Sequence, residues 1–271
     1  MAQALPTYAV RSKWTAHALW FLLLPILSYE MWAVFIAPQS HAPTLLAHSV
    51  ISDLFHRFGF HWAFMPGLVA VIALLAVHVA ENIRRENRHQ LWIAPDPFLY
   101  AVMLLESLGW AIPLLVIGAV INMRFGPQAA LAPALVSVTE PLIAHGYLAA
   151  HDPWGAWRQG VMLSLGAGIF EELVFRLFGL NLFDLITSAL FGKDHPLGIA
   201  IAMASTALLF AAAHFVSRDN AFDWPKAIFY FFGGVYFAVI YLWRGFGIAA
   251  ATHVLFDVMV TSIALKQDLG R

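Results

Sequence analysis

The chain has 271 residues, of which 61% are apolar and only 11% are charged, and its formal net charge is -1. Soluble domains are about 45–50% apolar and ~25% charged, so this composition argues against a soluble enzyme or a disordered chain. The near-zero charge argues against a nucleic-acid binder. The absence of cysteine excludes disulfides, thiol nucleophiles and cysteine-bound zinc. The class of protein that this composition favours is a polytopic helical membrane protein.

Continuous apolar runs predict eight membrane-spanning helices, because a hydrocarbon core of about 30 Å needs roughly 20 apolar residues per helix. The runs do not alternate with a period of two, as the strands of a membrane barrel would. The predicted spans are residues 18–37, 62–80, 98–121, 129–149, 159–180, 197–215, 227–243 and 246–265. The fourth is the weakest, since Pro133, Glu140, Pro141 and His145 interrupt it. We expect an all-α transmembrane bundle of about eight spans.

The chain shows no internal repeat and no linker, so we expect a single membrane domain. Residues 1–158 form N-terminal spans without a diagnostic motif, residues 159–265 carry the motifs described below, and residues 266–271 form a short tail. The first span follows Arg11 and Lys13 as a signal peptide would. It is too long and lacks a persuasive cleavage site, so we expect it to be retained.

Lysine and arginine in the short loops predict the orientation of the spans. With the N-terminus inside, the basic residues of the inner segments are Arg11, Lys13, Arg84, Arg85, Arg88, Arg158, Arg218, Lys226, Lys266 and Arg271. Those of the outer loops are Arg57, Arg124, Lys193 and Arg244. The excess inside predicts that both termini are cytoplasmic. We expect an integral protein of a prokaryotic inner membrane, because the chain is compact and lacks a targeting sequence.

Ionisable side chains at bilayer depth cost at least ~2.5–3.5 kcal/mol each, which makes them candidates for a functional site. We interpret the isolated ones as interhelical hydrogen-bonding groups, namely Glu30, Glu106, Glu140, His78 and His145. Glu106 or Glu140 could also belong to a second polar cluster near the site. Five histidines fall in predicted loops and should be solvated: His41, His48, His56, His61 and His89. Asp184 should lie at the interface, just past the fifth span.

The densest set of ionisable residues begins in the fifth span. Glu172 and Arg176 are four residues apart, so they share a helix face and can form an ion pair. Glu171 points about 100° away from Glu172 on a helix and has no local cation. Two neighbouring carboxylates in different surroundings are typical of sites in which one group is structural and the other exchanges protons.

Two further elements follow in the sixth and eighth spans. His214 comes four residues after Phe210, and the three alanines between them permit close packing of helices. His253 and Asp257 are again four residues apart on one face. An aspartate at this spacing could orient the imidazole, or both side chains could bind one cation. Three separate helices therefore bring ionisable groups that a hydrophobic bundle does not need.

These three elements resemble the signature of the CPBP intramembrane proteases, a family of CAAX proteases and bacteriocin-processing enzymes. The signature is Glu-Glu-x-x-x-Arg, then Phe-x-x-x-His, then His-x-x-x-Asn or Asp, each on a membrane helix. The resemblance covers residues 159–265, about 40% of the chain. The eukaryotic relative is the Ras-converting prenyl-protein endopeptidase. The resemblance implies an endopeptidase with its site in a cavity of the bundle, acting on a peptide or membrane protein that could carry a lipid.

The resemblance also implies roles for the six candidate residues. Glu171 and His214 would hold and activate the attacking water, and Glu172 would pair with Arg176. His253 and Asp257 would face the oxyanion or lie beside the water. The aromatic residue of the second element, Phe210, would pack and take no part in the reaction.

Asp257 stands where many family members have asparagine, and an ionised aspartate can only accept hydrogen bonds. It would therefore stay protonated, orient His253 or bind a metal. Glu171, His214, His253 and Asp257 could hold Zn²⁺ or another divalent metal. The His-Glu-x-x-His motif of zinc proteases is absent, which favours a glutamate-driven mechanism without an assured cofactor.

Other classes of membrane protein fit less well. The Gly-x-Ser-x-Gly, Gly-x-Gly-Asp and His-Glu-x-x-His motifs of three other intramembrane protease classes are absent. A proton-coupled transporter would also carry buried Glu, Arg and His, but no inverted repeat is present. A catalytically silent scaffold or immunity protein is the remaining alternative, and it would not need all of the motif side chains.

Overall fold

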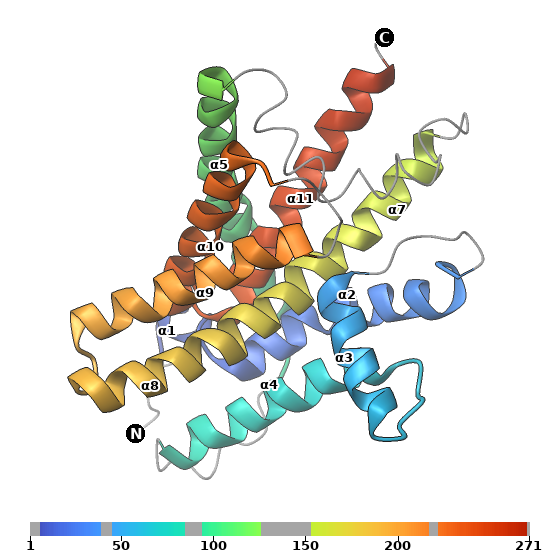
Figure 1. The fold of residues 1–271 in the computed structure, drawn as a ribbon. Helices are drawn as coiled ribbons and strands as arrows, with labels where there is room; N and C mark the ends of the chain where they lie inside the picture. Colours follow the sequence, from blue (N-terminus) through green and yellow to red (C-terminus); the bar gives the residue numbers. More distant parts are fainter. Residues whose placement is uncertain (1–5, 39–44, 85–93, 126–152, 217–221, 270–271) are drawn as a thin grey trace.

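A computed structural model describes residues 6–38, 45–84, 94–125, 153–216 and 222–269. Every regular element in these ranges is a helix, which confirms the all-α prediction. Seven helical stretches in this part of the chain are long and apolar enough to cross a membrane (Figure 1). The predicted span at residues 129–149, with Glu140 and His145, lies outside the described residues. His41 and His89 also lie outside the described residues.

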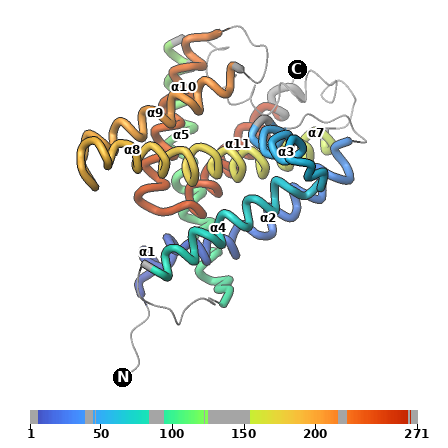
Figure 2. The backbone as a smooth tube through the Cα atoms, turned by 60° about the horizontal axis from the view of Figure 1, so that its bottom comes forward, coloured from blue at the N-terminus to red at the C-terminus, as the bar shows by residue number. Residues whose placement is uncertain are grey.

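The helices pack as a bundle in which α11 is the innermost (Figures 1 and 2). In α11, 72% of the membrane-spanning window is buried, against 22–39% in the other six candidate spans of the described residues. The elements are α1 (Tyr8–Arg11), α2 (Thr15–Phe35), α3 (Leu46–Arg57), α4 (Met65–Arg84), α5 (Pro97–Phe125), α7 (Pro153–Gly166), η1 (Ala167–Glu171), η2 (Leu173–Leu180), α8 (Asn181–Phe191), α9 (Pro196–Val216), α10 (Trp224–Arg244) and α11 (Phe246–Leu269).

A single residue, Gly245, joins α10 to α11. Its φ of 86° lies in the left-handed region that L side chains rarely adopt, so glycine is needed for so sharp a reversal. A Cβ at this position would also lie 3.1 Å from Cα of Lys13. The turn therefore brings the segment before α2 against the end of α10.

The start of α2, the end of α4 and the start of α5 meet at one end of the bundle. The hydroxyl of Thr15 donates to Glu81 in α4 over 2.7 Å, and Arg11 pairs with Asp96, which directly precedes α5. Because α11 starts at this end and runs away from it, the described chain begins and ends at opposite ends of the bundle (Figures 1 and 2). The charge count that placed both termini in the cytoplasm assumed eight crossings, of which seven lie in the described residues. The side of each terminus stays a prediction.

The motif-bearing helix is longer than its sequence suggests. The sequence predicted a span ending at residue 180, whereas helix continues from α7 through η1 and η2 to the end of α8. The first break is Gly192, with a φ of 91°. Asp184 therefore lies within a helix and is exposed, rather than following the span. The central turns, η1 and η2, are π-helical. The π-helix is rare in proteins, and where it occurs it is often found at a functional site.

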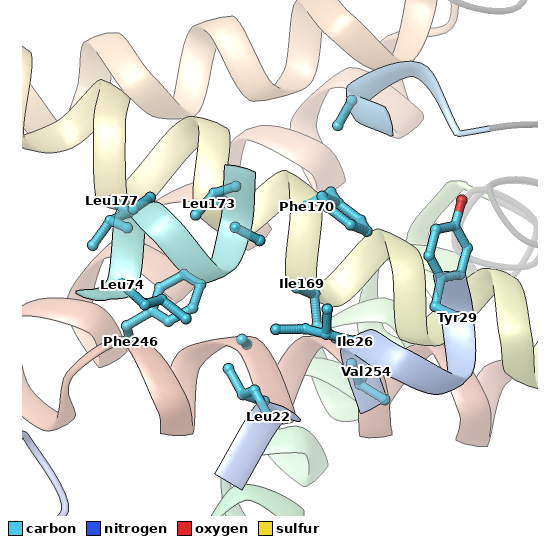
Figure 3. Close-up of a cluster of buried hydrophobic side chains, with 14 of the residues drawn as sticks. Leu22, Ile26, Tyr29, Leu74, Ile169, Phe170, Leu173, Leu177, Phe246 and Val254 are labelled. Atoms are coloured by element: carbon cyan, nitrogen blue, oxygen red, sulfur yellow. The ribbon is translucent and has the colours of Figure 1, made fainter. Parts of the chain in front are cut away.

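One face of the motif helix is fixed by apolar packing against α2, α4 and α11. Figure 3 shows Ile169, Phe170, Leu173 and Leu177 of η1 and η2 among the side chains of those helices. At Gly168, a Cβ would lie 2.5 Å from the backbone nitrogen of Val254 in α11. This close contact of two backbones places the polar side of the motif helix next to the histidine of α11.

Candidate active site

Glu172 links the first and third sequence elements. Its Oε1 lies 2.9 Å from Nδ1 of His253, and its Oε2 lies 3.1 Å from Nε of Arg176. The glutamate is fully buried, and Arg176 is only 1% exposed. The predicted ion pair between Glu172 and Arg176 is therefore confirmed. The carboxylate also holds the imidazole of a second helix.

Arg176 is further held by α10 and by two aromatic rings. Its Nη2 donates to the backbone oxygen of Gly234 over 3.1 Å. Its guanidinium lies 4.6 Å from the ring centre of Phe210 and 5.6 Å from that of Phe237. The contact between Nε and Glu172 lies within ion-pair distance but outside hydrogen-bond geometry, so two arginine nitrogens, Nε and Nη1, make no hydrogen bond. The arginine is thus a buried countercharge with spare donors.

Glu171 faces both histidines. Its Oε2 lies 3.8 Å from Nε2 of His214 and 3.9 Å from Nε2 of His253. This oxygen is buried and makes no hydrogen bond. The Glu171 side chain is 16% exposed, more than any of the other five candidate side chains, which are 8% exposed or less. Among the six candidate side chains, Glu171 is therefore the one most accessible from the surface of the bundle.

The orientation of His214 follows from one hydrogen bond. Its Nδ1 lies 2.8 Å from the backbone oxygen of Phe210. A carbonyl oxygen can only accept, so Nδ1 carries the proton. In the neutral ring, Nε2 is then an acceptor, and it is the atom that faces Glu171. The spacing of four residues between Phe210 and His214 thus fixes the tautomer of the histidine.

His253 is oriented by Glu172, which the sequence did not indicate. The predicted neighbour, Asp257, lies 3.7 Å from Nε2 of His253, beyond hydrogen-bond distance. The two side chains share a face as predicted, but Nδ1 of the ring is held by the first sequence element. Asp257 was predicted to stay protonated, to orient His253 or to bind a metal. The second of these roles is already filled by Glu172.

The donor atoms are spaced more widely than in a metal centre. Three distances between a histidine nitrogen and a carboxylate oxygen among the four proposed ligands are 3.7, 3.8 and 3.9 Å. Ligands of a tetrahedral zinc, each about 2.0–2.1 Å from the metal, lie ~3.4 Å apart. Within the described residues, no group of three or more His, Asp or Glu side chains could hold a metal ion. The metal site at these residues stays a prediction, and no step below runs through a metal.

Glu106 belongs to a second polar cluster, which touches none of the six candidate residues. Its carboxylate accepts hydrogen bonds from Tyr8, from Trp110 and from Arg244, whose Nη2 lies 2.8 Å away. Arg244 also donates to Ser12 over 2.9 Å. We call these five residues the Glu106–Arg244 cluster. The sequence had placed Arg244 in an outer loop, but it is the buried last residue of α10.

The other isolated polar residues are also buried. Glu30 of α2 lies 3.4 Å from Nε2 of His48 in α3. It therefore contacts a second helix, but its carboxylate oxygens and this nitrogen make no hydrogen bond, so the predicted interhelical hydrogen bond of Glu30 is not formed. His48 was expected to be solvated but is only 9% exposed, packed between the rings of Tyr29 and Phe170. His78 contacts Asn82 one turn later on its own helix.

None of the three sequence elements lies on α10, although this helix contacts the cluster. Gly234 accepts from Arg176, and a Cβ there would lie 2.9 Å from Cα of Ala207 in α9. The signal that could have drawn attention is the pair Gly233-Gly234 between aromatic residues in an apolar span, since paired glycines permit close helix approach.

Comparison with known families agrees with the resemblance seen in the sequence. Residues 153–259 match the family described as Rce1-like, type II CAAX prenyl endopeptidase. This stretch contains η1, η2, α9, α10 and the half of α11 that carries His253 and Asp257. No curated protein matches the chain. No solved structure matches it either.

Proposed function

Residues 153–259 place the chain in the Rce1-like family of type II CAAX prenyl endopeptidases, a family of intramembrane proteases, and from this premise we propose how its side chains cleave a peptide. The single observation that carries the proposal is the position of Glu171. Its buried oxygen makes no hydrogen bond and faces two imidazoles that come from different helices. The side chain is also the most exposed of the candidate set.

The attacking water would be held between Glu171 and His214. A gap of 3.8 Å between two acceptors is too long for a direct hydrogen bond and suits one bridging water. Such a water donates one proton to Oε2 of Glu171 and the other to Nε2 of His214. A lone pair of its oxygen is then free to attack the peptide carbonyl carbon. Glu171 takes the proton as the carbon–oxygen bond forms.

The tetrahedral intermediate needs a donor for its oxyanion. With Nδ1 engaged by Glu172, Nε2 of His253 is the atom that faces the reaction. A His253 ring that carries both protons donates from Nε2 to the oxyanion, because Nδ1–H stays on Glu172. When the carbon–nitrogen bond breaks, Glu171 returns the proton that it took from the water to the leaving amine. A protonated Asp257 beside Nε2 would supply a second donor.

Glu172 and Arg176 would shape the site without touching the substrate. The guanidinium balances a buried carboxylate that has to remain ionised to hold Nδ1 of His253. The arginine is packed on two aromatic rings and bonded to Gly234, so this countercharge cannot move away from the glutamate. A fixed imidazole needs no reorganisation as charge develops on the oxyanion.

The substrate class follows from the family. We propose a peptide or membrane protein with a prenylated cysteine near its C-terminus, presented from the lipid bilayer. The test uses purified protein in liposomes and a quenched fluorescent peptide that ends in a farnesylated Cys-aliphatic-aliphatic-X sequence. The same peptide without the farnesyl group is the comparison. Equal cleavage of both peptides contradicts the prenyl requirement, and cleavage of neither contradicts this substrate class.

The Glu171→Gln variant tests the mechanism. It keeps the shape of the side chain but removes the base, so cleavage should fall by about 10²–10⁴-fold with unchanged yield and elution profile. The matched control is Glu81→Gln, a carboxylate that contacts Thr15 at the far end of α4. Normal cleavage by Glu171→Gln contradicts the proposal. Ion flux that persists in this variant would favour a transporter instead.

A chelator separates this mechanism from a metal-driven one. The proposal predicts that cleavage survives extended dialysis against EDTA and 1,10-phenanthroline. A loss of cleavage that Zn²⁺ restores would contradict a reaction carried by Glu171 alone. Elemental analysis of the protein before and after dialysis checks that the treatment removed what was bound.

A further inference from the structure

Two aromatic side chains of α10 lie flat against the two histidines of the site. The ring centres of Tyr230 and His214 are 4.0 Å apart, and the ring planes differ by 25°. Those of Phe237 and His253 are 4.5 Å apart, with a difference of 17°. No residue of α10 belongs to the three sequence elements, so this helix takes part in the site through its aromatic face.

The spacing of the two rings matches the geometry of a helix. Tyr230 and Phe237 are seven residues apart, which is close to two turns, so they lie on the same face. Gly234 lies between them along the helix and is held by Arg176 on one side and by Ala207 on the other. This face of α10 is therefore fixed relative to the motif helix and to α9.

Each imidazole has a second constraint that acts within its plane. The backbone oxygen of Phe210 holds Nδ1 of His214, and Glu172 holds Nδ1 of His253. The Phe210 ring contacts both imidazoles at an angle, with ring centres 4.6 Å and 6.0 Å away. A hydrogen bond leaves the ring free to tilt about the bond, and a flat aromatic neighbour removes that freedom. Together they direct both Nε2 atoms toward Glu171.

We propose that Tyr230 and Phe237 are positioning residues that keep the Nε2 atoms of His214 and His253 directed at Glu171. This inference rests on the proposed function and goes beyond it, since it assigns a role to two rings that act through the imidazoles on which they stack. In this proposal the flat faces of the two aromatic rings position the imidazoles by stacking on them. The phenolic hydroxyl of Tyr230 is therefore dispensable, and an aromatic residue of either kind serves at both positions.

Kinetics of leucine variants test the proposal. Tyr230→Leu and Phe237→Leu should each lower kcat by about 10–100-fold with little change in KM, because a small misplacement of a reacting group costs that much. Tyr230→Phe and Phe237→Tyr keep a ring and should stay within a few-fold of the unchanged protein. The matched control is Phe229→Leu, a buried phenylalanine of α10 whose ring contacts those of Phe256 and Tyr230 but has no ring contact with an imidazole among the described residues.

Three outcomes would overturn the inference. One is a Phe229→Leu variant as impaired in kcat as the two test variants, since the effect would then be general packing. The second is an equal loss in Tyr230→Phe and Tyr230→Leu, which would assign the effect to the hydroxyl. The third is a fall in activity that lies wholly in KM. If Glu171→Gln remains active, the proposed function fails; if only these variants behave like Phe229→Leu, this inference alone fails.

A second measurement does not need a substrate. Nitrogen NMR of protein labelled with ¹⁵N-histidine reports which ring nitrogen carries the proton. With Tyr230 in place, the His214 signals should show a single tautomer with the proton on Nδ1. In Tyr230→Leu the ring can tilt away from the Phe210 oxygen, which weakens the hydrogen bond that holds the proton on Nδ1, so the two tautomers should average. Phe229→Leu should leave the signals unchanged. A single unaltered tautomer in Tyr230→Leu contradicts the positioning role.

Discussion

Two buried polar clusters lie in the same bundle, and they differ in how completely their polar atoms are bonded. In the Glu106–Arg244 cluster the carboxylate receives three side-chain donors, and the guanidinium donates to a hydroxyl and a backbone oxygen as well. In the candidate site, Oε2 of Glu171, Oε2 of Glu172 and two nitrogens of Arg176 make no hydrogen bond. We call the Glu106–Arg244 cluster closed, because its carboxylate and guanidinium are hydrogen-bonded, and the candidate site open, because several of its polar atoms are not.

The difference separates a structural role from a chemical one. A buried polar group without a partner costs about 1–3 kcal/mol, so a cluster that only holds helices together should satisfy every atom. A site that has to receive water and a peptide needs donors and acceptors that the protein itself leaves unused. Charge at bilayer depth is common to both clusters. Unbonded polar atoms also occur at the buried Glu30–His48 pair. The candidate site is distinguished by an unbonded carboxylate oxygen that faces two imidazoles from different helices.

The largest effect should come from removing the buried countercharge of the open cluster. Arg176→Met leaves Glu172 in an apolar setting without its cation, which costs about 3–5 kcal/mol when a buried pair is broken. We expect little folded protein, measured by yield and thermal unfolding in detergent. Adding Glu172→Gln should restore much of the stability but not the cleavage. If Arg176→Met were as stable as the unchanged protein, the pair would not be the buried anchor described here.

A smaller effect is expected in the closed cluster. Glu106→Gln keeps the size of the side chain but removes the charge that Arg244 bonds, at a cost of about 1.5–3 kcal/mol. The unfolding temperature should fall, while cleavage per folded molecule, measured below that temperature, should stay unchanged. A folded Glu106→Gln protein without activity would show that the closed cluster contributes to catalysis and would remove the contrast.

The smallest effect should come from Asp96, at the edge of the closed cluster. The backbone N–H of Leu99 and the guanidinium of Arg11 hold the pKa of the Asp96 carboxyl below its usual value. A lowered pKa stabilises the folded state at pH values above the usual one of about 3.9, and this stability is lost as the pH falls through the folded-state value. Asp96→Asn should therefore unfold at a lower temperature than the unchanged protein at pH 7.

The same comparison at acid pH sharpens the contrast. Asparagine can still accept from the Leu99 N–H at the start of α5, so only the charge is tested. The gap between the two unfolding temperatures should shrink as the pH is lowered toward about 3. A gap that stays constant with pH would mean that the Arg11–Asp96 pair contributes nothing through its charge.

Much of the bundle and of the site could be predicted from local sequence. Apolar runs of sufficient length determine the spans, because each run depends only on its own residues. The pairing of Glu172 with Arg176 was predictable for the same reason, since helical spacing alone brings them together. The match over residues 153–259 agrees with motifs that were visible in the chain itself.

The remainder depends on contacts between distant parts of the chain. The residues next to Arg244 in the sequence suggest a charged residue in a loop, but its partner Glu106 lies 138 residues earlier in the chain. His48 looks solvated in a polar loop, yet it is buried against Phe170 of η1. The π-helical turns at η1 and η2 have no local signature in the sequence. For the same reason the stacking of α10 on two histidines could not be read from the motifs.

The bond between Glu106 and Arg244 has a consequence for biogenesis. Glu106 enters the membrane with α5, long before the ribosome has made the α10–α11 hairpin that carries its cation. During that interval the carboxylate has no arginine to bond, and Ala9 and Ser12 lack the contacts that Arg244 makes with them. The N-terminal segment can already contact α4 and the start of α5 through Thr15 and Arg11, but its bonds with Arg244 form only after the last hairpin has been inserted. A chain truncated before α10 should therefore be less stable in the membrane than the full chain.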